Sequence, residues 1–149
     1  MFGLVAAQAA YRDGQEWLTQ ALAYLEANRD YLVEFFQREF PEIGIFKPEG
    51  TFLAWLDCRK MGLENPYQFF LEEARVALND GLAFGEDGKG FVRMNFGCSR
   101  AVLQEALTRM KAALQKQERC INEANWAGPG FAAAGAHQWA GRRYCSGIR

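Results

Sequence analysis

The stretch that determines the interpretation of this chain is Gly90-Phe91-Val92-Arg93-Met94-Asn95-Phe96-Gly97-Cys98-Ser99-Arg100. Its pattern predicts a short strand, a tight turn and then a helix. Side chains alternate between the two faces of a strand, so the strand has an apolar face and a polar face that carries Arg93 and Asn95. That polar face suits a carboxylate, because the planar fork of arginine donates two parallel, charge-assisted hydrogen bonds. The alternative is an arginine that is only solvated.

The overall composition is that of an ordinary globular protein. The chain has 149 residues, of which 50% are hydrophobic, and a formal net charge of -1. This length suits one domain with a proper core, and this charge gives no attraction to nucleic acid or to anionic membranes. No apolar run approaches the roughly 20 residues of a membrane-spanning helix. The first residues lack a basic region and meet Arg12 and Asp13 early, so we expect no signal peptide and a cytoplasmic protein.

The cysteines and the histidine do not form a pattern typical of a metal or catalytic site. No pair has CxxC spacing, and His137 is the only histidine, so the sequence predicts no structural zinc. A catalytic triad would have to use His137, which lies in the least regular part of the chain. We therefore expect free thiols in a reducing compartment, at Cys58, Cys98, Cys120 and Cys145.

The first 40 residues predict two helices. Residues 3–12 form an Ala-rich helix, after which Asp13 is the expected N-cap of the next helix, with Glu16 completing a capping box. The second helix runs to about Phe40 and stops at Pro41. Its apolar side chains follow helical spacing, and we expect them in the core: Leu18, Ala21, Leu22, Leu25, Leu32, Phe35, Phe36 and Phe40.

The middle of the chain predicts short strands around one helix. Residues 43–46 and 51–57 are strand candidates, and the second is so apolar that we expect both its faces to be covered. Asn65-Pro66 supplies an N-cap and a first-turn proline for a helix ending near Arg75. Val76-Ala77-Leu78 is a further short strand candidate, and Asp87-Gly88 indicates a hairpin turn before the Arg93 strand.

Ser99 is the expected cap of a final helix, in which Leu103, Leu107, Met110 and Leu114 repeat at three-to-four spacing. The order of elements predicts an α+β domain, with helices packed on one face of a small sheet. After about residue 119 the periodicity ends. The expected division is therefore two helices over 1–40, an α+β domain over 41–118, and a poorly ordered tail over 119–149.

Four segments in sequence order resemble the fold-type I pyridoxal-phosphate enzymes, and more narrowly the cystathionine β-lyase branch of that group. The segments are Ala-Ala-Tyr-Arg-Asp-Gly-Gln-Glu-Trp-Leu at 9–18, Pro-Glu-Gly-Thr-Phe-Leu-Ala-Trp-Leu-Asp-Cys-Arg at 48–59, Val-Ala-Leu-Asn-Asp-Gly at 76–81 with Phe84-Gly85, and 90–98. The resemblance spans about residues 2–116. It implies the C-terminal small domain of that fold, with 1–40 as the helices that link it to a large domain.

The resemblance also implies a role for Arg93. The arginine of the Arg-x-Asn strand in such enzymes binds the α-carboxylate of the amino-acid substrate, and here that motif is Arg93-Met94-Asn95. Asn95 keeps the pattern but receives no assigned contact. Gly50 and Thr51 match a turn near the mouth of the active site, although a purely structural role in the turn is an equal alternative.

Pyridoxal phosphate is the cofactor that the resemblance implies for the complete enzyme. The lysine that anchors it in the family lies upstream of the matched region, and none of the five lysines here stands in that lysine's motif. We therefore expect no covalent attachment of the cofactor to this chain, no catalytic residue in it, and no activity from it alone.

The leading hypothesis is a C-terminal fragment of a pyridoxal-phosphate-dependent carbon–sulfur β-lyase. The complete enzyme would be a homodimer that cleaves cystathionine or S-substituted cysteines to a thiol, pyruvate and ammonia, with this part binding the substrate carboxylate. Two alternatives stay open. One is a fragment of a class I/II aminotransferase, since a carboxylate clamp serves both reactions, and the other is a non-catalytic α+β binding module.

Overall fold

Arg93 lies on an inner strand of a four-stranded antiparallel sheet. A computed structural model describes residues 1–126, with the side chains of residues 1–119. The strand order is β1-β2-β4-β3. In this register both Trp55 and Asn79 lie opposite Arg93. The strands are β1 (Gly44–Ile45), β2 (Leu53–Asp57), β3 (Asn79–Asp80) and β4 (Phe91–Asn95).

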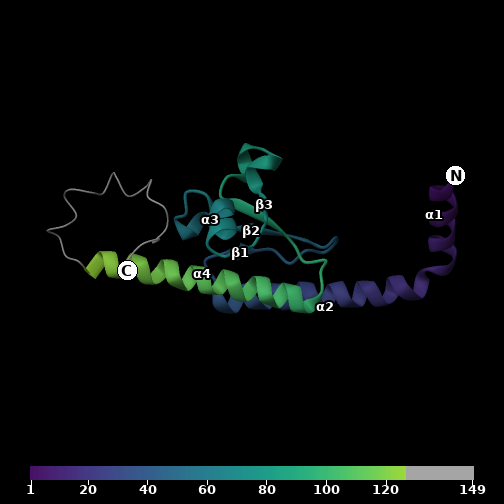
Figure 1. The fold of residues 1–149 in the computed structure, drawn as a ribbon, viewed down its shortest axis with the longest axis horizontal. Helices are drawn as coiled ribbons and strands as arrows, with labels where there is room; N and C mark the ends of the chain where they lie inside the picture. The colour runs from purple at the N-terminus through teal and green to yellow at the C-terminus, as the bar shows by residue number, and fades with distance from the viewer. Residues whose placement is uncertain (127–149) are drawn as a thin grey trace.

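Helices cover one face of the sheet, and the core lies between the two layers. Figure 1 shows two long helices running alongside each other next to the strands, with a short third helix nearby. The apolar face of β4 is buried, as its alternation predicts, so the expected α+β architecture is confirmed. The helices are α2 (Gln15–Glu39), α3 (Pro66–Glu72) and α4 (Arg100–Trp126). The largest fully buried side chains include Leu32, Phe36, Leu56, Phe69, Phe70, Val92, Phe96, Leu103 and Leu107.

The predicted caps of two helices are present. The Asn65 side chain accepts a hydrogen bond from the backbone N–H of Gln68 at 3.0 Å, and Pro66 begins α3. Before α4, Ser99 Oγ accepts a hydrogen bond from the N–H of Val102 at 3.4 Å. The backbone of α4 continues to Trp126, beyond the expected boundary at residue 118. The rest of the expected tail, 127–149, lies outside the described residues.

The prediction of a capping box at Asp13 is wrong. Asp13 is the last residue of α1 (Phe2–Asp13), and its carboxylate lies 2.9 Å from the guanidinium of Arg12. Gly14 occupies the N-cap position of α2, and no side chain caps that helix. The break comes at Gly14, whose N–H still bonds Ala10 in α1 and whose carbonyl already accepts from α2.

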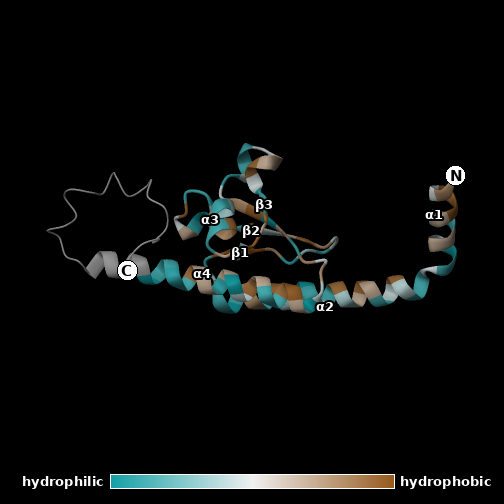
Figure 2. Ribbon diagram, in the orientation of Figure 1, coloured by the Kyte–Doolittle hydropathy of each residue, from teal (hydrophilic) through white to brown (hydrophobic). Residues whose placement is uncertain are grey.

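The apolar stripe of α2 is buried over only part of its length. Leu32, Phe35, Phe36 and Phe40 lie in the core as predicted. The N-terminal part of the stripe was predicted wrongly, because Leu22 is 53% exposed and Leu18 is also exposed. This part of α2 projects past the sheet toward α1, and Figure 2 shows hydrophobic residues along both. Helical spacing identifies an apolar face but not how far the neighbouring layer extends.

The connection between β3 and β4 differs from the predicted hairpin. The segment 76–78 is not a strand, and Asp87-Gly88 lies in a 3₁₀ turn, η3 (Glu86–Gly88), which follows another, η2 (Gly81–Phe84). The two turns are held together where the backbones of Gly81 and Gly88 meet. A Cβ atom on Gly81 would lie 2.6 Å from the carbonyl oxygen of Phe91 and would overlap that of Gly88.

A buried amide ties α2 to the turn that follows β4. Asn28 is fully buried, and its Nδ2 donates to the carbonyl oxygens of Phe96 at 3.2 Å and Cys98 at 2.8 Å. Its Oδ1 is buried without a hydrogen-bond partner among the described residues. Nothing in the sequence separates this asparagine from the exposed polar residues of α2, because its partners come from a distant segment.

We expect Asn28→Ala to lower the free energy of unfolding by about 1–3 kcal/mol, because the carbonyls of Phe96 and Cys98 lose their donor. Urea denaturation followed by circular dichroism measures the change. Gln37→Ala is the matched control, since Gln37 is an exposed amide of the same helix and should cost less than about 0.5 kcal/mol. Equal effects at the two positions would contradict the structural role of Asn28.

We expect the buried thiol of Cys58 to make the free energy of unfolding fall as the pH becomes alkaline. Cys58 is 1% exposed, and burial, reinforced by the charge of Asp57, raises its pKa from 9.0 to about 12. A raised thiol pKa contributes stability that is fully present below pH 9 and is lost as pH rises toward 12. Between pH 8 and 10 the wild type should lose about 1 kcal/mol more than Cys58→Ala in urea denaturation. Parallel pH profiles for the two proteins would refute this.

Candidate functional site

The face of the sheet opposite the helices carries an aromatic layer, which we define as Trp55, Phe84 and Phe91. Trp55 stacks on Phe91 with ring centroids 5.7 Å apart and an interplanar angle of 19°. It meets Phe84 edge-on at 5.6 Å. The rings come from β2, η2 and β4 and leave the second face of β2 half-buried, so the expectation that both faces of this strand are covered is met only in part.

Arg93 lies at one end of the aromatic layer. Its Nε and Nη2 atoms donate to Oδ1 of Asn79 at 3.4 and 3.2 Å. Its Cζ atom lies 4.3 Å from the ring centroid of Phe84, a cation–π distance. Its Nη1 atom has no hydrogen-bond partner among the described residues. Arg93 is therefore half-buried and held in place, and the alternative of a merely solvated arginine does not describe it.

Arg59 lies at the other end of the aromatic layer and, unlike Arg93, is paired with a carboxylate. Its Cζ atom lies 4.6 Å from the ring centroid of Phe91, and two of its nitrogens donate to the carboxylate of Asp57 at 2.9 and 2.7 Å. This contact lowers the pKa of Asp57. Arg93 has no carboxylate partner among the described residues. Of these two arginines, Arg93 therefore offers the unneutralised charge to an anionic ligand.

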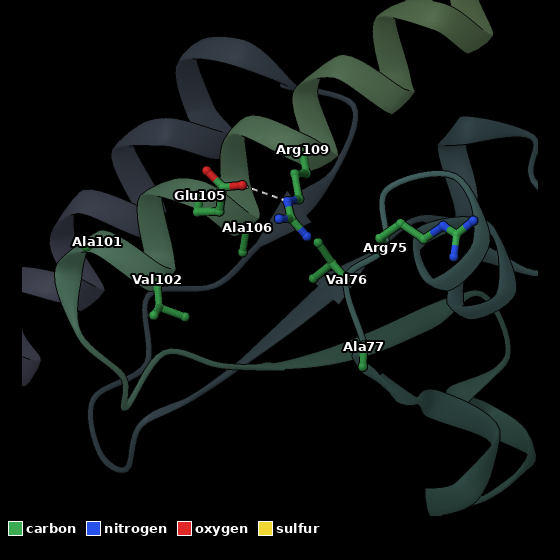
Figure 3. A pocket seen from close by; sticks show the side chains of 8 residues that line it. All are labelled: Arg75, Val76, Ala77, Ala101, Val102, Glu105, Ala106 and Arg109. Atoms are coloured by element: carbon green, nitrogen blue, oxygen red, sulfur yellow. Dashed lines mark hydrogen bonds and ion pairs between the residues drawn. The ribbon is translucent and has the colours of Figure 1, made fainter.

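Arg93 also lines a groove of about 480 Å³ between the segment 76–79, the end of β4 and the start of α4. A second groove of about 450 Å³ adjoins it and shares the residues Val76, Ala77, Val102 and Ala106. Figure 3 shows this second groove, where Arg109 is bonded to Glu105 at 2.8 Å. Glu105 neutralises Arg109, and Arg75, which also lines the second groove, is exposed, whereas Asn79 and Phe84 hold the guanidinium of Arg93.

Asn95 does not complete the clamp that its spacing suggested. Its Oδ1 accepts a hydrogen bond from the N–H of Gly97 at 2.8 Å, so it shapes the turn after β4. Thr51 likewise has a structural role in its turn. Its φ of 65° lies in the left-handed region, and its Oγ1 accepts from the N–H of Leu53 at 3.3 Å.

Sequence reasoning missed Asn79 and Phe84, the two residues that contact the Arg93 guanidinium. Both lie in the segment that resembles the family, but they were not selected as site residues. Asn79 meets Arg93 only because β3 pairs with β4 in this register. Phe84 reaches it only because η2 folds back over β4, which the sequence pattern does not show.

The model of the family described as "Aminotransferase class I and II" matches residues 2–110. The chain belongs to this family. Among its curated relatives, cystathionine beta-lyase PatB of Bacillus subtilis is 39% identical over 115 residues, which cover 76% of this chain and 30% of the relative. The structure of cystalysin from Treponema denticola, which contains pyridoxal 5'-phosphate, is 30% identical with a TM-score of 0.73, and the match covers 77% of this chain and 30% of that one.

A pyridoxal-phosphate-bound C-S lyase from Staphylococcus hominis is a further neighbour of this aminotransferase-family chain. It is 36% identical with a TM-score of 0.68, and the match covers 74% of this chain and 30% of that chain. The chain thus spans about a third of the length of the relatives it matches. These likenesses confirm the resemblance to cystathionine β-lyases and the small-domain fold, and they show a pyridoxal-phosphate-dependent family.

The described residues do not by themselves fit pyridoxal phosphate. A lysine that anchors this cofactor must present a free amine in an enclosed site. Three of the lysines form ion pairs instead, between Lys47 and Asp30 at 2.9 Å, Lys111 and Glu39 at 2.6 Å, and Lys116 and Glu73 at 2.8 Å. Lys60 and Lys89 are exposed.

Within residues 1–126, no three histidine, cysteine or acidic side chains gather closely enough to bind a metal ion. In the same part of the chain, no helix combines the length and the apolar character needed to cross a bilayer. His137 and Cys145 lie outside the described residues, as do the side-chain contacts of Cys120.

Proposed function

We propose that this chain supplies the substrate-carboxylate site of a pyridoxal-phosphate-dependent carbon–sulfur β-lyase of the cystathionine β-lyase type. The observation that carries the proposal is Arg93, an oriented guanidinium without a carboxylate partner among the described residues, beside a groove. Relatives named as cystathionine β-lyases support the reaction type. The complete protein would be a cytoplasmic homodimer that cleaves cystathionine or S-substituted cysteines.

In this proposal the chain binds and orients the substrate, while the cofactor supplies the bond-breaking chemistry when it is bound elsewhere in the complete protein. The free N–H groups of Arg93 donate to the α-carboxylate, which fixes one end of the substrate. Apolar residues of the groove, among them Val76 and Val102, exclude water beside it. A fixed carboxylate presents the rest of the amino acid in one orientation, which is the entropic part of the catalytic task.

A chimera tests the proposal. Residues 2–116 of this chain replace the matching part of PatB from Bacillus subtilis, and we call the product the PatB chimera. We expect it to release pyruvate and a thiol from cystathionine in a reaction that requires pyridoxal phosphate. A chimera that folds and retains pyridoxal phosphate through dialysis, but does not bind cystathionine, would refute the proposal.

An aminotransferase is the second candidate, because this chain also matches an aspartate aminotransferase from Pyrococcus abyssi at 30% identity. The products separate the two reactions. A lyase forms pyruvate and thiol without any added 2-oxo acid. An aminotransferase needs a 2-oxo acid and converts it to the corresponding amino acid, with no thiol released.

A further inference from the structure

We propose that Asn79 and Phe84 are positioning residues that hold the Arg93 guanidinium with only its Nη1–Nη2 edge open to a carboxylate. The proposal deepens the proposed function and rests on it, since the carboxylate is that of the amino-acid substrate. It assigns a binding direction and two residues to the site. Three observations support it. The Nε–Nη2 edge of the Arg93 guanidinium is occupied, one face of the guanidinium is covered by Phe84, and the amide of Asn79 that orients it is neutral.

The first observation is the occupied edge. A guanidinium can present two N–H groups to a carboxylate either from Nε and Nη2 or from Nη1 and Nη2. Oδ1 of Asn79 accepts from both Nε and Nη2 of Arg93, at 3.4 and 3.2 Å, and so fills the first of these edges. Nη1 has no partner among the described residues, and Nη2 keeps its second hydrogen. A carboxylate can therefore bind in a bidentate manner only at the Nη1–Nη2 edge.

The second observation is the covered face. The ring of Phe84 lies 4.3 Å from Cζ of Arg93 and blocks approach from that side. The ring attracts the cation without consuming any of its hydrogen bonds. Trp55 supports the Phe84 ring edge-on at 5.6 Å. Phe84 thus restricts rotation of the guanidinium and leaves its free donors available.

The third observation is that the orienting group is neutral. An amide oxygen orients the guanidinium and leaves its positive charge intact, whereas a carboxylate at residue 79 would also neutralise that charge. The other end of the aromatic layer provides the contrast, since Asp57 holds Arg59 and neutralises it. Asn79 is held in place by pairing with β4, and Asp80 begins η2 by accepting from the N–H of Leu82 at 3.1 Å.

The first test uses the 149-residue chain with ¹⁵N-labelled arginine and needs no substrate. We expect the Hε proton of Arg93 to exchange with water about tenfold more slowly than that of Arg75, an exposed arginine with no hydrogen-bond partner among the described residues. Asn79→Ala should abolish this protection, and Asn79→Asp should restore it. Phe84→Leu should remove the ring-current shift of the Arg93 side-chain protons. Wild-type exchange as fast as that of Arg75 would overturn the proposal.

The second test uses the PatB chimera and separates orientation from charge. Asn79→Ala and Phe84→Leu should each raise the KM for cystathionine about threefold to tenfold, with kcat within about twofold of the parent. Asn79→Asp should raise KM although it restores slow exchange, because it neutralises the charge. In the Arg93→Ala background neither substitution should have a further effect. Full additivity in that background would overturn the proposal.

The two tests distinguish failure of this inference from failure of the proposed function. Fast exchange of the Arg93 Hε proton overturns the orientation, whatever the kinetics show. Slow exchange together with an unchanged KM for Arg93→Ala overturns the carboxylate role, and with it the assignment of Asn79 and Phe84 to substrate binding.

Discussion

Replacing Arg93 by alanine in the PatB chimera should raise the KM for cystathionine by about 30-fold to 700-fold. Loss of a bidentate carboxylate partner costs on the order of 2–4 kcal/mol, and each 1.4 kcal/mol is a factor of ten. The contact is present both when substrate binds and when it reacts, so most of the change should fall on KM and less on kcat. Steady-state kinetics of pyruvate release measure both constants.

Two further variants separate the fork of Arg93 from its charge. Arg93→Lys keeps the charge but loses the planar pair of donors, so its KM should lie between those of the parent chimera and Arg93→Ala. Arg59→Ala is the matched control, because Arg59 is on the same face but is already neutralised by Asp57, and its KM should change less than threefold. An unchanged KM for Arg93→Ala would remove Arg93 from the site.

Gly81→Ala should destabilise the chain by about 3 kcal/mol or more, at or above the upper end of the usual cost of overpacking. The added Cβ would lie 2.6 Å from the carbonyl oxygen of Phe91 and would overlap that of Gly88, and neither backbone group can move without disturbing β4 or η3. Because Phe84 follows in the same 3₁₀ turn, the ring should also leave the Arg93 guanidinium. Urea denaturation measures the first effect, and the Arg93 side-chain shifts report the second.

Gly50→Ala is the control for this substitution. No atom lies within 4 Å of a Cβ built at Gly50, so alanine there should change stability by less than about 0.5 kcal/mol. Gly88→Ala should resemble Gly81→Ala, since its Cβ would overlap the carbonyl of Gly81. If Gly81→Ala were as stable as Gly50→Ala, the close contact of the two turns would be refuted.

The parts of the fold that depend on local chemistry were predictable. Alternation placed Val92 and Met94 on the buried face of β4, and short polar side chains marked the starts of α3 and α4. The predictions failed where a distant segment decides the outcome. Whether Leu22 is buried depends on how far the sheet extends beneath α2. The conformation of the turn at Asp87-Gly88 depends on a backbone contact with Gly81.

The candidate site shows the same division. By itself, the sequence determined that Arg93 lies on the polar face of a strand, because strand alternation is local, and that its neighbourhood resembles the family. Only the tertiary structure decided which atoms hold that arginine. The antiparallel register brings Asn79 opposite Arg93, and the folding of η2 over β4 brings Phe84 against its guanidinium. The physical reason is that strand register and loop packing are set by long-range contacts, which no local pattern of residues encodes.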